Sequence, residues 1–172
     1  NQDAIIALVD GKFAGFCYIE SWQHGKFVAH SGLIVHPDYR NHGLAKKIKS
    51  KVFDYSLKKY PNAKVFGITT GLAVMKLNSD LGYKPVTFSE LTNDQSFWKG
   101  CQTCKNYDVL TRTEQQMCLC TGMLFDPKNK VIYPPLLLHH RRKRRKEKED
   151  NVKTCVQSVQ SVQSVQSVIV FI

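Results

Sequence analysis

The chain lacks any run of about 18 consecutive apolar residues, which excludes a transmembrane helix. No secretory signal opens it, and six cysteines in 172 residues are too few for a disulfide-stabilised secreted scaffold, so we expect a cytoplasmic protein. Acidic residues are also scarce, since 14 Asp and Glu accompany 25 Lys and Arg and leave a net charge of +11. This surplus indicates an anionic partner: a nucleic acid, a membrane surface or a phosphorylated cofactor.

The apolar content, in contrast, is high enough for a packed core. Hydrophobic residues make up 42% of the sequence, which excludes disorder along the whole chain. The length fits one compact domain with an appendage, because domains cluster at roughly 100–200 residues.

The positive charge is concentrated near the C-terminus. Residues 139–153 carry eight Lys and Arg and three acids, whereas residues 1–138 carry a net charge of +6. Four copies of Val-Gln-Ser follow at 156–167, and a three-residue period matches neither a helix nor a strand. We expect 139–172 to be a low-complexity tail without a core of its own. A nuclear-import or nucleic-acid patch is the alternative, but no aromatic residues are interleaved there for base stacking.

Short apolar runs separated by turn signals predict three antiparallel strands at 4–9, 13–20 and 27–35. Asp10-Gly11 is typical of a type I′ hairpin turn, and Gly32 inside the third strand indicates a bulge.

A helix is predicted from 44 to about 60, because apolar residues recur there at helical spacing. A strand at 64–69, a helix at 72–81 and a last strand at 84–88 follow. The fold class is therefore α/β with a mixed sheet, in the order β-β-β-α-β-α-β. We expect six lysines on the solvent face of the long helix: Lys46, Lys47, Lys49, Lys51, Lys58 and Lys59.

The junction between the third strand and the long helix is suited to a phosphate group. Gly43 stands at the helix start, followed by small Ala45, so a ligand could approach the backbone closely. The N–H groups and the dipole at a helix N-terminus favour an anion such as pyrophosphate. An ordinary capped helix is the alternative interpretation.

Two motifs on these elements resemble the GNAT superfamily of acyl-CoA-dependent N-acyltransferases. Residues 40–45, Arg-Asn-His-Gly-Leu-Ala, resemble its Arg/Gln-x-x-Gly-x-Gly/Ala signature, and residues 73–83 are similar to its helix ending in Leu-Gly-Phe. The resemblance covers residues 4 to about 90. It implies a GNAT-like fold with acetyl-CoA or another acyl-CoA as cosubstrate and transfer of the acyl group to a primary amine.

The resemblance also implies where the cofactor binds. CoA would lie where two strands splay beside the Gly32 bulge, with its pantetheine arm along the strand end and its pyrophosphate on main-chain amides. The implied cofactor-binding residues are Leu33, Val35, Arg40, Asn41, His42, Gly43, Leu44, Ala45 and Asn78.

The catalytic groups depart from the family pattern. Asn78 occupies the position that often holds a tyrosine acid, and asparagine cannot supply a proton at neutral pH. Tyr83 or water is then the candidate acid, and Glu20 and His30 are the candidate bases. Glu20 could instead be a solvated strand end, and His30 a structural histidine.

Family members place a strand and two helices before the first hairpin, and these helices line the amine pocket. The sequence predicts that this N-terminal portion is missing, which puts the activity of this chain in question.

Four cysteines follow the GNAT-like segment at metal-ligand spacing. Cys101-x-x-Cys104 and Cys118-x-Cys120 place four thiols within twenty residues, although the second pair has one intervening residue where two is commoner. A zinc site, a redox disulfide and reduced thiols packed as small hydrophobes all stay open. Residues 97–120 also resemble a group of bacterial GNAT proteins from Bacteroidota that we associate with arginine-biosynthesis genes.

The leading hypothesis is an N-acyltransferase whose small-molecule amine is an amino acid such as glutamate. One alternative is a non-catalytic CoA-binding or zinc-stabilised interaction module, and another is a histone- or nucleic-acid-directed protein that uses the basic tail. We expect no membrane partner and disfavour nucleic acid; the sequence does not predict the oligomeric state. The predicted division is a partial GNAT domain at 1–92, a Cys-rich extension at 93–138 and the tail at 139–172.

Overall fold

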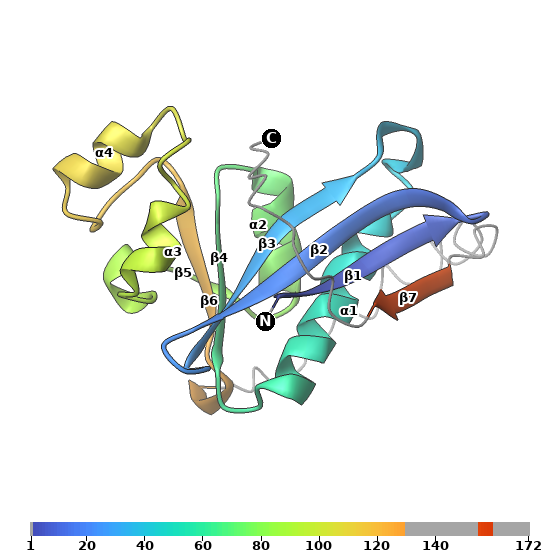
Figure 1. Cartoon of the computed structure of the whole chain (residues 1–172), viewed down its shortest axis with the longest axis horizontal. Helices are drawn as coiled ribbons and strands as arrows, with labels where there is room; N and C mark the ends of the chain where they lie inside the picture. Colours follow the sequence, from blue (N-terminus) through green and yellow to red (C-terminus); the bar gives the residue numbers. More distant parts are fainter. Residues whose placement is uncertain (1, 130–154, 160–172) are drawn as a thin grey trace, which may run out of the picture.

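A mixed seven-stranded sheet forms the centre of the computed structural model, which describes residues 2–129 and 155–159 (Figure 1). The strand order is β5-β6-β4-β3-β2-β1-β7. The strands are β1 Gln2–Val9, β2 Lys12–Trp22, β3 Phe27–Val35, β4 Lys64–Thr69, β5 Lys84–Val86, β6 Thr121–Phe125 and β7 Cys155–Val159. The helices are α1 Leu44–Lys59, α2 Leu72–Asp80, α3 Gln95–Lys99 and α4 Tyr107–Arg112.

The first three strands form the expected antiparallel meander, and the predicted mixed α/β fold class is confirmed. Asp10 and Gly11 both have positive φ angles, of 50° and 74°, as a type I′ turn between β1 and β2 requires. The last predicted strand is shorter than expected, because Phe88–Glu90 forms a 3₁₀ turn after β5.

The expected bulge lies at Gly32. The β2–β3 ladder shifts register between Phe16 and Tyr18, and Gly32 has a φ of 64°. A Cβ atom at Gly32 would stand 2.5 Å from a ring carbon of Tyr18, so the tyrosine ring lies directly against the glycine backbone.

We expect Gly32→Ala to lower the free energy of unfolding by about 2–4 kcal/mol, since left-handed strain and overpacking add together. Gly11→Ala is the matched control, because Gly11 also has a positive φ but no atom of the described residues, its chain neighbours aside, lies within 4 Å of its added Cβ. The control should lose only about 1 kcal/mol. Equal losses in urea denaturation would contradict the contact between Tyr18 and Gly32.

The strands β3 and β4 separate after a short parallel ladder. Phe27–Ala29 pair with Lys64–Phe66, and no further ladder pair joins these two fully described strands. The other edge of β4 pairs along its length with β6. The sheet therefore splays from His30 onward, on the side that leads to the N-terminus of α1.

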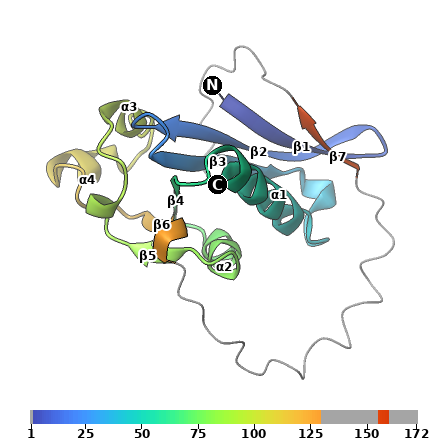
Figure 2. The ribbon, with the colours of Figure 1, turned by 90° about the horizontal axis from the view of Figure 1, so that it is seen from below.

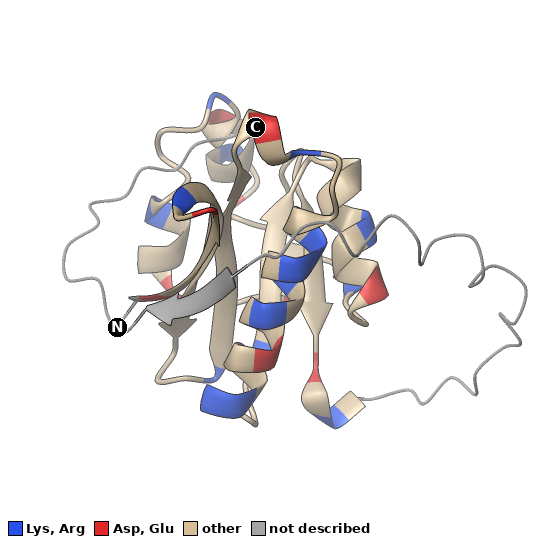
Figure 3. Ribbon diagram, turned by 90° about the vertical axis from the view of Figure 1, so that its right-hand side faces the viewer, with Lys and Arg blue, Asp and Glu red and all other residues tan. Residues whose placement is uncertain are grey.

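Helix α1 packs against β1, β2 and β3, and Figure 2 shows α1 and α2 on the same side of the sheet. Its core stripe includes Leu44, Ile48 and Val52, as the spacing predicts. Basic residues recur along α1 (Figure 3). The placement of Lys49 on the solvent face is wrong, because this side chain is 3% exposed and belongs to the buried stripe.

The Cys-rich extension is built onto the sheet. Strand β6 inserts between β5 and β4, and a second core cluster joins Phe66 of β4 to Trp98 of α3 and Leu110 of α4. Sequence patterning did not predict α3, α4 or β6, because each spans only five or six residues, too few for a hydrophobic period.

Strand β7 lies within the predicted tail and pairs antiparallel with β1 from Ala4 to Leu8. The Val-Gln-Ser period predicted no strand, but an exposed sheet edge offers backbone donors and acceptors to an extended segment whatever its side-chain pattern. The rest of the tail, including the basic run, lies outside the described residues. Within the described ranges, no helix combines the length and apolarity needed to cross a membrane.

Candidate functional site

The loop between β3 and α1 leaves the N-terminus of α1 open. Gly43 is the N-cap residue with a φ of 77°, and, its own chain neighbours aside, no atom of residues 2–129 or 155–159 lies within 4 Å of the position its Cβ would take. The first turn of α1 holds no acidic residue, whereas Lys46 and Lys47 are exposed there. Since a helix leaves its first N–H groups without intrahelical partners, this end presents donors and positive charge to one open space.

Arg40 fixes this loop to the end of β3, because its Nε donates a hydrogen bond of 3.0 Å to the Val35 carbonyl. Asn41 adopts a φ of 64°, so a second left-handed residue precedes Gly43. Asn41, His42 and Gly43 are exposed, whereas the Leu44 side chain packs in the core and only its backbone faces the loop. The structure thus gathers the residues of the first motif around one end of α1.

A buried polar network lies where β3 and β4 begin to separate. His30 is 8% exposed, and its Nε2 lies 2.8 Å from the Ser56 hydroxyl, which donates its proton to the Val52 carbonyl. Ser56 must therefore accept from Nε2–H, which leaves the lone pair of His30 on Nδ1. That atom lies 3.0 Å from Lys49 Nζ and 3.0 Å from the Tyr83 hydroxyl.

The electrostatics of this network follow from its burial. Removal from water lowers the pKa of Lys49 to about 8. Burial, assisted by the charge of Lys49, lowers the pKa of His30 well below its usual value. Burial also raises the pKa of Tyr83 well above its usual value. At neutral pH the network therefore holds a neutral imidazole, a neutral phenol and an ammonium that loses its proton readily.

The three predicted catalytic residues divide between the two faces of the sheet. In the β2–β3 register Ile19 pairs with His30 and Glu20 with Ala29, so Glu20 and His30 point to opposite faces. His30 and Tyr83 meet on the α1 side. Glu20 lies on the other face, where its Oε2 accepts a hydrogen bond of 3.4 Å from the Ser31 hydroxyl.

Asn78 of α2 is 1% exposed, and among the described residues its Oδ1 has no hydrogen-bond partner. Its backbone carbonyl accepts from Tyr83 N, so the end of α2 positions the tyrosine of the network. A buried acceptor without a donor is costly and is suited to a ligand N–H group.

Lys49 and Ser56 are the site residues that sequence reasoning missed. Lys49, Val52 and Ser56 occupy positions i, i+3 and i+7, which lie on one face of a helix. This spacing could have predicted that Lys49 and Ser56 share the buried face with Val52. The expected solvent face of the helix includes Lys49, but the structure places this lysine among the buried residues of α1.

The four cysteines of the extension line one small pocket about 20 Å³ in volume. Burial and the neighbouring thiols raise the pKa of Cys101 to about 11 and that of Cys120 to about 12. Among the described residues, no group of three or more His, Cys, Asp or Glu side chains is disposed to hold a metal ion.

Residues 1–74 match the model of the Acetyltransferase (GNAT) family. No curated protein matches the chain in sequence. Among solved structures, Escherichia coli ElaA is similar at 14% identity with a TM-score of 0.50, over 73% of this chain and 68% of that chain. The family match and this similarity identify the fold as that of the GNAT acetyltransferases.

Two further similar structures have bound ligands. N-acetylglutamate synthase from Neisseria gonorrhoeae, complexed with coenzyme A and N-acetyl-glutamate, is 12% identical with a TM-score of 0.49, over 68% of this chain and 24% of that chain. The acetyltransferase yncA from Salmonella typhimurium, with acetyl-CoA, is 15% identical with a TM-score of 0.48, over 72% of this chain and 64% of that chain. This chain thus spans about a quarter of the synthase.

Proposed function

We propose that this chain is an N-acyltransferase that transfers an acetyl or other acyl group from acyl-CoA to a primary amine. The observation that carries the proposal is the position of the splayed β3–β4 pair beside the open N-terminus of α1. An anionic group can bind at the helix end while an extended arm inserts between the separated strands. Helix α1 supplies the positive pole and exposed Lys47 of its first turn adds to it, whereas Lys46 is ion-paired with Asp80 at 3.4 Å.

In this proposal the CoA pyrophosphate binds the main-chain amides of residues 40–45. The pantetheine arm follows β3 past Leu33 and Val35, whose backbone is no longer paired with β4. The partnerless Oδ1 of Asn78 would accept from an amide N–H of this arm.

The reaction is attack of a neutral amine on the thioester carbonyl, which forms the C–N bond and breaks the C–S bond. A base must remove a proton from the ammonium, and the departing thiolate must gain one. We assign the base to Glu20, because its carboxylate lies on the sheet face that α1 leaves uncovered. His30 is the weaker candidate, since its one lone pair is directed at Lys49 and Tyr83. Tyr83 or water supplies the proton to the thiolate.

The proposed acceptor is an amino acid such as glutamate, and the support for it is the resemblance of residues 97–120 to the Bacteroidota group. A cytoplasmic location stays a prediction. A CoA-binding module without catalysis is the second candidate, favoured by Asn78 at the position of the family's tyrosine acid. The nucleic-acid alternative depends on a basic run outside the described residues.

Gly43→Asp should lower the affinity for acetyl-CoA by about 10- to 100-fold, because its carboxylate would repel the pyrophosphate. The measurement is the rise in Tm on titration with acetyl-CoA. Gly43→Asn is the matched control, since asparagine has the same shape, carries no charge and tolerates a positive φ. Equal loss in both variants would contradict a phosphate site at this helix end.

A further inference from the structure

The Cys-rich extension brings four thiols from two distant turns to one pocket. Cys101 and Cys104 follow α3, whereas Cys118 and Cys120 lie between α4 and β6. All four line the same small pocket, whose apolar lining includes Ile68, Phe88 and Leu110. The chain thus returns after thirteen intervening residues and brings the second pair of cysteines to the pocket that the first pair lines.

The backbone holds the first pair in a tight turn. Cys104 N donates to the Cys101 carbonyl at 2.9 Å, which folds the Cys-x-x-Cys segment on itself. Asn106 N then donates to Cys104 Sγ at 3.5 Å. An amide that points at a cysteine sulfur two residues earlier stabilises negative charge on that sulfur, as a thiolate ligand requires.

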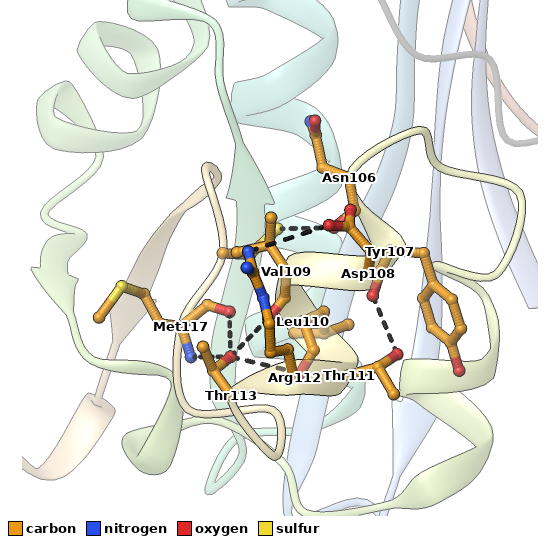
Figure 4. Close-up of polar contacts among 10 residues, drawn as sticks. Asn106, Tyr107, Asp108, Val109, Leu110, Thr111, Arg112, Thr113 and Met117 are labelled. Atoms are coloured by element: carbon orange, nitrogen blue, oxygen red, sulfur yellow. Dashed lines mark hydrogen bonds and ion pairs between the residues drawn. The ribbon is translucent and has the colours of Figure 1, made fainter.

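Thr113, at the end of α4, contacts Met117, the residue before the second pair (Figure 4). Its Oγ1 accepts from Met117 N at 3.3 Å and lies 2.7 Å from the Met117 carbonyl. These contacts hold the residue before Cys118 against the helix end. Cys118 Sγ in turn lies 3.9 Å from the Asn106 carbonyl, beside the first turn.

This stretch has little apolar packing of its own. From Cys101 to Cys120, all of which the structure describes, Leu110 is the one buried hydrophobic residue, and Cys101, Tyr107, Cys118 and Cys120 pack only partly buried against the same core cluster. Helix α4 has only six residues, too few to be stable alone. Short segments of this kind are commonly stabilised by a disulfide or a metal ion.

We propose that Cys101, Cys104, Cys118 and Cys120 bind one soft divalent cation, Zn²⁺, as four thiolates that hold the extension together. Among the described residues these thiols are not disposed to hold a metal ion, so binding requires the four cysteine side chains to rearrange within the pocket that they line. The backbone turns that carry them already surround the pocket. Four protein ligands leave no open coordination position, so the role is structural and separate from acyl transfer.

The deciding experiment is a Co²⁺ titration of the reduced, metal-free full chain. The expected result is one Co²⁺ per chain with thiolate-to-metal charge-transfer absorption and the visible bands of a tetrahedral site, both abolished by one equivalent of Zn²⁺. Weak absorption without charge transfer, no binding, or two disulfides in the chain as purified would each overturn the proposal.

Variants locate the site. Cys104→Ser and Cys118→Ser should each bind Co²⁺ more weakly and with lower charge-transfer absorption per ion, whereas Cys17→Ala should leave both unchanged because Cys17 lies in the other core cluster. Zn²⁺ at a hundredfold excess over its Kd should raise the Tm of the wild type by about 5–10 °C. An unchanged Tm would contradict the structural role, and this measurement needs no variant that must fold.

Discussion

Lys49→Met is expected to raise the free energy of unfolding by about 3 kcal/mol at pH 7. The wild type buries an ammonium whose pKa falls from 10.5 to about 8, whereas methionine has a similar length and no charge to desolvate. The variant leaves no orphaned acceptor, because the Tyr83 hydroxyl lies 3.0 Å from His30 Nδ1 and can donate to it. Removal of a polar contact should therefore stabilise the protein.

The extra stability of Lys49→Met over the wild type should decrease as the pH rises. The folded pKa lies below the unfolded one, so the unfolded chain binds more protons between about pH 8 and 10.5. The cost of burying Lys49 is complete below pH 8 and disappears as pH rises to 10.5. The difference between variant and wild type should thus fall to about 1 kcal/mol at pH 9.5.

The measurement is urea denaturation of both proteins from pH 7 to 9.5. Tyr83 and Cys17 have pKa values raised by burial and are present in both proteins, so the difference between the two proteins reports Lys49 together with the effect of its charge on the pKa values of Cys17 and His30. Lys47→Met, on the exposed side of α1, is the control and should change stability by less than about 0.5 kcal/mol. A loss of stability in Lys49→Met, or a gain independent of pH, would contradict the account of the network.

Glu20→Gln is expected to lower kcat by about 10²- to 10⁴-fold while the affinity for acetyl-CoA stays unchanged. Glutamine keeps the shape of the side chain and can still accept from the Ser31 hydroxyl, but it cannot take a proton from the amine. The measurement is a steady-state assay of acyl transfer to candidate amines, together with acetyl-CoA binding.

Glu114→Gln provides the control, because this exposed carboxylate follows α4 and lies outside the proposed site. It should leave kcat unchanged. If Glu20→Gln retains full activity, the base lies elsewhere and His30 returns as the candidate. If the wild type binds acetyl-CoA but acylates no amine, the non-catalytic module is favoured instead.

The hydrophobic pattern of the sequence predicted those strands and helices that are long enough to show a strand or helix periodicity. The strands up to β4, both long helices and the Gly32 bulge follow from alternation, helical spacing and glycine placement. Strand β6 carries no such signal, because its place between β5 and β4 is set by pairing with distant strands. Strand β7 depends in the same way on the open edge of β1.

In the candidate site, too, groups of contiguous residues could be predicted from the sequence, whereas groups assembled from distant residues could not. The open glycine loop before α1 could be predicted, because Gly43 and its neighbours are contiguous in sequence. Its role in binding phosphate stays a proposal. The network could not be predicted, since His30 and Tyr83 are separated by 53 residues and meet only through sheet register and the end of α2. Residue type misled the placement of Lys49, because lysine is rarely buried without a partner.

Calorimetric titration of the wild-type chain with CoA, compared with pantetheine, tests the central claim most directly. The account predicts saturable binding of one CoA per chain, with pantetheine at least about 10-fold weaker because it lacks the pyrophosphate that the N-terminus of α1 would hold. Absence of saturable CoA binding, or equal affinity for the two ligands, would contradict it.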